Sequence, residues 1–122
     1  MAISDEIRAK CGISDEDAYF AFDSAHLTAT DHSPLERVAK CFTAGPLKGH
    51  SLKLVGRADA RGESDYNMTL GQSRADAVGV YLSSHGLNKA KAQSTSQGSI
   101  GATGTNEATW QKDRRVDVML GD

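Results

Sequence analysis

The stretch of sequence that decides the fold runs from residue 52 to residue 84 and reads LKLVGRADARGESDYNMTLGQSRADAVGVYLSS. Its first four residues alternate well enough to predict a strand, and residues 56–62 then form a polar loop bounded by glycines. The longest helical pattern in the chain follows, from about residue 64 to Ser84. His85 and Gly86 end it, with Gly86 as the expected left-handed cap. The loop therefore lies at the carboxyl end of a strand, where α/β sheets tend to place ligand sites.

Further strands and helices flank this unit. In chain order they are a strand at 18–22, a helix from Ser33-Pro34 to residue 44, a weak strand at 93–97, a short helix within 105–113 and a final strand over 116–120. Phe20 and Phe22 should share one face of the first strand. The predicted class is α+β, a two-layer α/β sandwich in the order β-α-β-α-β-(α)-β. We expect a mixed parallel and antiparallel four-stranded sheet with helices on one face.

The composition limits the function. The chain has 122 residues, 39% hydrophobic and 25% charged, which suits one compact domain. Its formal net charge is −2 and it has no basic block, so a nucleic-acid contact is not expected. No apolar run reaches the roughly 18 to 20 residues of a membrane span. Two cysteines are too few for a zinc site of paired C-x-x-C motifs, and we expect neither metal nor cofactor.

One face of the long helix is not entirely apolar. At about 100° per residue, Asn67 and Arg74 lie on one stripe among side chains that should face the sheet. An unpartnered buried guanidinium is costly, so Arg74 either reaches the edge of the stripe and pairs with a nearby Asp, or meets an anionic ligand. Asp59 in the preceding loop suggests the second. An Asp and an Arg across one cleft suit a zwitterion such as an amino-acid head group.

These residues carry a resemblance to a known family. GRADARG at 56–62, YNMTLGQSRADAV at 66–78 and DRRV at 113–116 resemble the pattern G-H-x-D-x-x-G, Y-N-x-x-L-[SG]-x-x-R-A-x-x-V and N-R-R-V. This pattern is typical of the OmpA-like peptidoglycan-binding domain, and the chain is most similar to its form in peptidoglycan-associated lipoproteins. Arg57 and Asp113 depart from it. The resemblance divides the chain into an N-terminal extension at 1–17 and the domain at 18–122.

The resemblance implies a non-catalytic domain that binds cell-wall peptidoglycan through the diaminopimelate of the stem peptide. By position, Asp59 and Arg74 would take the ammonium and the carboxylate of its free amino-acid end. The other expected ligand-binding residues are Asn67 for a hydrogen bond, Leu70 along the apolar stem, Asp23 at the border and Arg114 at the mouth of the last strand. Arg114 shares side-chain parity with Val116 and should point inward. Such a domain anchors an outer-membrane or envelope protein on the periplasmic side, with other envelope proteins as partners.

Two other function classes stay open from the residues alone. A small cell-wall hydrolase or amidase would need a nucleophile and a base, and Ser24, His26 and Asp23 lie together on one turn. The four His show no metal-ligand spacing, and we expect them to be solvated. A scaffold that binds a protein's C-terminal carboxylate at Arg74 is the other class, although it leaves Asp59 without a role.

The two cysteines, Cys11 and Cys41, either form a disulfide or stay as free thiols. The periplasmic location that the resemblance implies favours the disulfide. Closing a loop of this length would stabilise the fold by about 3 to 4 kcal/mol on the chain-entropy model. Since that location requires export and the opening residues carry no secretory signal, we expect that the natural leader is missing from this sequence.

Overall fold

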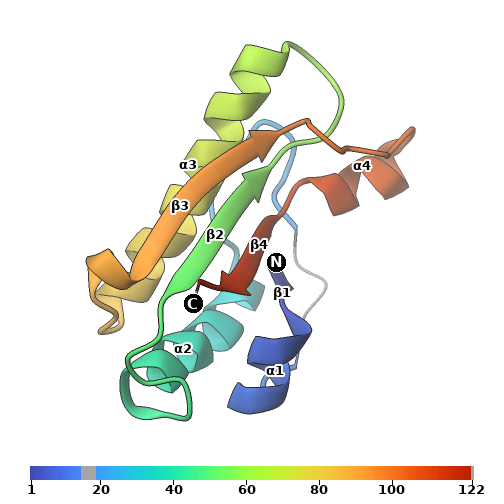
Figure 1. Ribbon diagram of the computed structural model, residues 1–122. Coiled ribbons are helices and arrows are strands. Elements are labelled where there is room, and N and C mark those ends of the chain that lie inside the picture. The colour runs from blue at the N-terminus through green and yellow to red at the C-terminus, as the bar shows by residue number, and fades with distance from the viewer. Residues whose placement is uncertain (15–18, 122) are drawn as a thin grey trace.

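A four-stranded mixed sheet forms one layer of the molecule (Figure 1). The computed structural model describes residues 1–14 and 19–121. The strands are β1 (Ala2–Ile3), β2 (Leu52–Arg57), β3 (Ala92–Gly98) and β4 (Val116–Leu120), in the spatial order β1-β4-β2-β3. β2 runs parallel to β3 and antiparallel to β4, and β1 runs parallel to β4. The predicted mixed sheet of four strands is confirmed.

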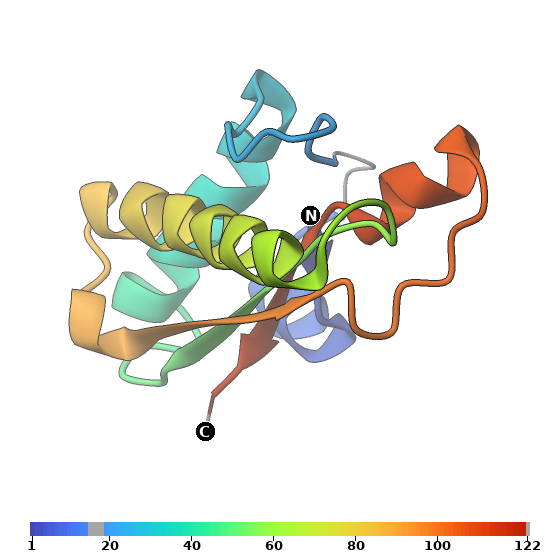
Figure 2. The same ribbon diagram turned by 90° about the horizontal axis from the view of Figure 1, so that it is seen from above.

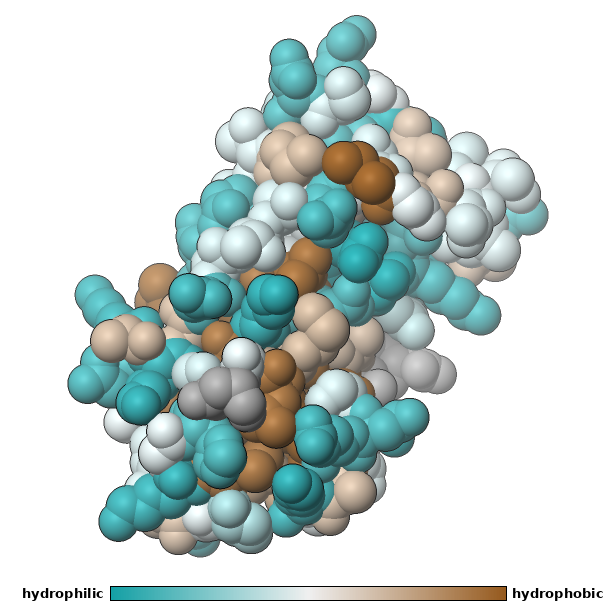
Figure 3. All heavy atoms as spheres, in the orientation of Figure 1, coloured by the Kyte–Doolittle hydropathy of each residue, from teal (hydrophilic) through white to brown (hydrophobic). Residues whose placement is uncertain are grey.

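The helices lie against one face of the sheet and beyond its edges. They are α1 (Asp5–Cys11), α2 (Ala29–Ala44), α3 (Ser64–Ser84), the short 3-10 helix η1 (Lys89–Lys91) and α4 (Glu107–Asp113). Figure 2 shows α2 and α3 on the same side of the sheet, with α4 beyond one end of it. The opposite sheet face, seen in Figure 3, carries mainly polar side chains around a narrow band of apolar atoms. None of the described helices is long and apolar enough to cross a membrane.

The predicted first strand is wrong over residues 19–22, which form no strand, and residue 18 lies outside the described part of the chain. Phe20 is 3% exposed and Phe22 is 60% exposed, so the two rings do not share a face. The chain turns directly afterwards at Asp23, whose φ is 58°. The strand that completes the sheet is β1, which pairs with Asp117 and Val118 of β4.

The helix predicted to begin at Ser33-Pro34 begins earlier, at Ala29, and ends at Ala44 as expected. A capping box explains the earlier start, because the carboxylate of Asp31 accepts from the backbone N–H of Thr28 at 3.1 Å. Pro34 therefore lies inside α2 and not at its first position. The predicted strand at 93–97 and the helices ending at residues 84 and 113 agree with the structure within a few residues.

The N-terminal residues belong to the same hydrophobic core as the sheet. Ile3 and Ile7 are 3% and 0% exposed, and they pack in one cluster with buried side chains of α2, α3, β2 and β4. A disulfide joins Cys11 at the end of α1 to Cys41 in α2, with their Cα atoms 5.7 Å apart. The boundary predicted after residue 17 falls within residues 15–18, outside the described part of the chain.

Two facing glycines fix the position of α3 on the sheet. A Cβ atom added to Gly56 of β2 would lie 1.6 Å from the carbonyl oxygen of Gly71, and one added to Gly71 would lie 2.3 Å from Oγ of Ser96. Only glycine lets helix and strand approach this closely. The contact sets the start of α3 beside the loop that follows β2, which brings the predicted site residues together.

Candidate binding site

A small pocket of about 70 Å³ opens where β2 ends and α3 begins. All six residues predicted to bind a ligand line it, namely Asp23, Asp59, Asn67, Leu70, Arg74 and Arg114. They come from the segment before α2, the loop after β2, the first half of α3 and the turn between α4 and β4. The structure thus brings together residues that lie up to ninety-one positions apart in the sequence, from 23 to 114.

Arg74 forms the floor of the pocket and is completely buried. Its guanidinium donates to three backbone carbonyl oxygens, those of Ser24 at 2.8 Å, Arg57 at 2.8 Å and Ala21 at 3.1 Å. The alternative in which Arg74 reaches the edge of the stripe and pairs with an Asp is therefore wrong. Its partners are carbonyls of the segment before α2 and of the last residue of β2, so Arg74 ties that segment to the end of the strand.

Arg114 lies beside it and is 5% exposed, as its inward parity predicts. It donates from Nε to the carbonyl of Phe20 at 2.7 Å and from Nη1 to the carboxylate of Asp59 at 3.2 Å. A third contact reaches Oε1 of Glu107 in α4 at 2.7 Å. Arg114 thereby connects the segment around residue 20, the loop after β2 and α4.

Asp59 is the buried carboxylate of the pocket, with 4% exposure. Its oxygens accept from the side chains of Arg61 and Arg114 and from the backbone N–H of Arg61 at 3.0 Å. Burial alone would raise the pKa of Asp59, but these hydrogen bonds outweigh it and hold the pKa below the ordinary value. Asp59 is therefore ionised at neutral pH.

Asp59 and Arg74 face the same pocket without pairing. Within the described residues, no hydrogen bond or ion pair joins their side chains, whereas Asp59 pairs with Arg61 and Arg114. Burial, followed by the positive charge of Arg114, lowers the pKa of Arg74 to about 10. The guanidinium is still cationic at neutral pH, so the pocket presents charges of both signs.

The other predicted residues have more specific surroundings. The side-chain amide of Asn67 donates to the backbone carbonyls of Arg61 at 2.8 Å and Asp59 at 3.4 Å, which ties the loop after β2 to α3. Leu70 is half-buried and supplies an apolar wall. Asp23 is exposed and accepts a hydrogen bond from the hydroxyl of Tyr66.

Several residues at the rim were not predicted. Arg61, Phe22 and Tyr66 line the pocket, and Trp110 and Glu107 contact Arg61 from α4. Arg61 lies two positions after Asp59, and Tyr66 lies one position before Asn67. Both stand within the quoted motif segments, so their closeness to predicted site residues was a signal that the sequence offered. Phe22 is expected on one strand face with Phe20, because their spacing matches a strand.

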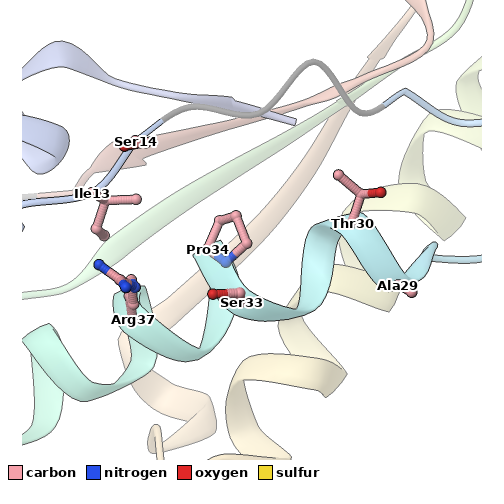
Figure 4. Close-up of a pocket in the computed structure, with 7 residues that line it drawn as sticks. All are labelled: Ile13, Ser14, Ala29, Thr30, Ser33, Pro34 and Arg37. Carbon is pink, nitrogen blue, oxygen red and sulfur yellow. The ribbon is translucent and has the colours of Figure 1, made fainter.

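A second hollow, of about 330 Å³, lies between Ile13 and the N-terminal half of α2. Figure 4 shows its lining, in which Arg37 is the charged side chain and Pro34 an apolar one. It contains none of the predicted site residues, and among the described residues that line it Arg37 has no carboxylate beside it.

The residues considered for catalysis do not form a catalytic arrangement in the part of the chain that the structure describes. Oγ of Ser24 accepts from the backbone N–H of His26 at 3.1 Å, while the imidazole of His26 is exposed. Across residues 1–14 and 19–121, no cluster of three or more His, Cys, Asp or Glu could hold a metal ion.

Comparisons with known proteins give one consistent family. A family model described as "OmpA family" matches residues 19–116. The peptidoglycan-associated lipoprotein of Pseudomonas aeruginosa is 38% identical over 104 residues, covering 82% of this chain and 59% of that protein. The homologue of the same name from Pseudomonas putida is 37% identical over 102 residues, covering 82% of this chain and 60% of the relative. The chain thus spans about 60% of the length of these relatives.

Solved structures agree with this. The crystal structure of the peptidoglycan-associated lipoprotein from Burkholderia pseudomallei superposes with a TM-score of 0.78 at 35% identity, covering 84% of this chain and 86% of the other. The C-terminal domain of Helicobacter pylori MotB superposes with a TM-score of 0.77 at 22% identity, covering 89% and 85%, and shows a shared fold.

Proposed function

The chain belongs to the OmpA family, and on this premise we propose that it binds peptidoglycan without catalysis and attaches an outer-membrane or envelope protein to the cell wall. The names of the relatives at 37% and 38% identity support peptidoglycan as the ligand. Binding would take place on the periplasmic side of the outer membrane, where this polymer lies. The disulfide between Cys11 and Cys41 suits such an oxidising compartment.

We further propose that the pocket takes the zwitterionic end of diaminopimelate in the stem peptide. The observation that carries this is that Asp59 and Arg74 line one pocket and do not pair with each other. A guanidinium has five N–H donors, and the three carbonyl partners of Arg74 leave others for a ligand carboxylate. Asp59 would take the ammonium, and Leu70 would contact the methylene stem.

A single site of this kind binds with modest affinity. Hydrogen bonds to charged groups contribute about 1.5 to 3 kcal/mol each, and the small pocket adds little apolar area. A polymer with many stem peptides raises the effective concentration, so many copies of the domain can hold the wall firmly although each bond is weak.

The test is cosedimentation with purified diaminopimelate-containing sacculi, together with calorimetry using free diaminopimelate. Asp59→Asn removes the negative charge and keeps the shape, and we expect binding to fall more than about tenfold because a charged hydrogen bond is lost. Asp76→Asn is the matched control, since Asp76 lies exposed on the outer side of α3 and accepts from Gln72 at 2.9 Å.

Equal binding of the Asp59→Asn variant and the wild-type protein would contradict the site. A peptide with a free C-terminal carboxylate serves as the competing ligand in the same calorimeter. If that peptide binds and diaminopimelate does not, the domain is a scaffold for a protein terminus and the proposed ligand is wrong.

A further inference from the structure

Arg61 already pairs with the carboxylate of Asp59, which the ammonium of the proposed ligand would need. Its Nη2 lies 2.8 Å from Oδ2 of Asp59, its Nε lies 3.2 Å from Oδ1, and its backbone N–H binds the same Oδ1. Arg114 takes a further position on Oδ2 at 3.2 Å. Both oxygens of Asp59 are therefore already engaged by cations of the chain itself.

The guanidinium of Arg61 is held by two aromatic rings as well. Its central carbon lies 4.2 Å from the ring centre of Phe22 and 4.1 Å from that of Trp110, so both rings contact the guanidinium. Glu107 in α4 lies 3.7 Å from Nη2. These contacts come from two segments, the residues before α2 and α4, and they hold the side chain of Arg61 at the rim of the pocket.

The two arginines at the Asp59 carboxylate limit which ligands can bind there. An ammonium that approaches Asp59 meets Arg61 and Arg114 at the same carboxylate, and like charges at such distances repel. The pocket of about 70 Å³ leaves little room for a third cation beside them. Arg114 is buried and fixed by the carbonyl of Phe20, whereas the side chain of Arg61 is 32% exposed and can swing into solvent.

We propose that Arg61 is a gate that exchanges with the ligand's ammonium, leaving Asp59 when the zwitterion enters and returning when it departs. This inference rests on the proposed function. It concerns the specificity of the site, because a ligand must carry a cation to replace Arg61. A dicarboxylate without an amino group could reach Arg74 but could not displace Arg61 from Asp59.

The contact between Arg61 and Trp110 allows movement of Arg61 to be measured directly. Trp110 is the only Trp in the chain, and its ring faces the guanidinium of Arg61. Displacement of Arg61 removes a cation from the indole face, so the fluorescence of Trp110 should change when diaminopimelate binds. Pimelate, the same carbon chain without amino groups, should leave the fluorescence unchanged.

Arg61→Met tests the gate by removing the competing cation while keeping the length of the side chain. Calorimetry should show an affinity for diaminopimelate several-fold higher than that of the wild-type protein, with no such gain for pimelate. The ligand-induced fluorescence change should disappear in the variant. Arg8→Met is the matched control, because Arg8 pairs with Asp5 in α1, away from the pocket, at a similar side-chain exposure of 36%.

The outcomes separate the gate from the site. Weaker binding of diaminopimelate by Arg61→Met would mean that Arg61 holds the ligand, and unchanged binding would mean that it never competes; each result overturns the gate. An equal gain for diaminopimelate and pimelate would indicate general loosening and would also overturn it. If the wild-type protein and both variants fail to bind diaminopimelate, the proposed ligand is wrong, and the proposed gate is wrong with it.

Discussion

The floor and the rim of the pocket use the same residue type in opposite ways. On the floor, Arg74 and Arg114 are 0% and 5% exposed and donate to backbone carbonyls of neighbouring loops. On the rim, the Arg61 side chain is 32% exposed and contacts a carboxylate and two aromatic rings. The floor therefore fixes the fold and the site together, whereas the rim can change without loss of the fold. Substitutions in the two regions should separate stability from ligand selectivity.

The largest effect is expected on the floor. Arg74→Met removes three hydrogen bonds that a completely buried guanidinium donates, and hydrogen bonds to charged groups contribute about 1.5 to 3 kcal/mol each, so the free energy of unfolding should fall by at least about 3 kcal/mol. Arg61→Met should cost less than about 1 kcal/mol because it breaks contacts of a partly exposed side chain. Urea unfolding followed by circular dichroism measures both. Equal losses would show that the floor and the rim do not differ.

The disulfide gives the next effect, in a region away from both floor and rim. Replacing Cys11 and Cys41 with Ala reopens a loop with a sequence separation of 30, which should lower the free energy of unfolding by about 2 to 4 kcal/mol. Sedimentation with sacculi at 25 °C should not change, because neither residue lines the pocket. Loss of binding by a folded double variant would show that the pocket depends on the position of α1.

The close contact between Gly56 and Gly71 predicts a smaller loss of stability, and a second glycine of α3 serves as its control. Gly71→Ala would place a Cβ 2.3 Å from Oγ of Ser96 and 2.9 Å from the carbonyl oxygen of Gly56, so α3 must shift and stability should fall by about 1 to 3 kcal/mol. Gly79→Ala meets ordinary contacts at 3.5 Å and should gain up to about 1 kcal/mol from helix propensity. A shift in the melting temperature of the same sign for both variants would contradict this packing.

The pattern of the long helix could be predicted from sequence because its period is local. The stripe that holds Asn67, Arg74 and Val78 is buried as predicted, and the loop with Asp59 lies beside it. The partners of Arg74 could not be predicted, because the carbonyls of Ala21 and Ser24 lie about fifty residues away and carry no side-chain signal.

The predicted strand is wrong over residues 19–22 and β1 is not predicted, because local spacing does not decide either segment. Phe20 and Phe22 match a strand by spacing alone, but Asp23 adopts a left-handed conformation and turns the chain away from the sheet. The strand at Ala2–Ile3 has only two residues, too few to show any alternation. Short edge elements are set by their partner strand and not by their own pattern.

The smallest expected effect is on the pH dependence of stability, through the carboxylate of Asp59. The pKa of Asp59 is lowered in the folded state, so its contribution to stability is present above its ordinary pKa of about 3.9 and is lost as pH falls through the lowered value. Arg61→Met removes a hydrogen bond that lowers this pKa and so brings it closer to the ordinary value; the stability that is lost as the pH falls should then be smaller in the variant than in the wild-type protein. Urea midpoints between about pH 3 and pH 6 test this; identical profiles would mean that Arg61 does not stabilise the carboxylate.

A crystal structure of the protein soaked in diaminopimelate tests the central claim most directly. We predict one ligand in the pocket, with a carboxylate on the guanidinium of Arg74, the adjacent ammonium on Asp59, and the side chain of Arg61 turned out into solvent. Density for the ligand at another surface, or in this pocket with neither Asp59 nor Arg74 in contact, would contradict the account.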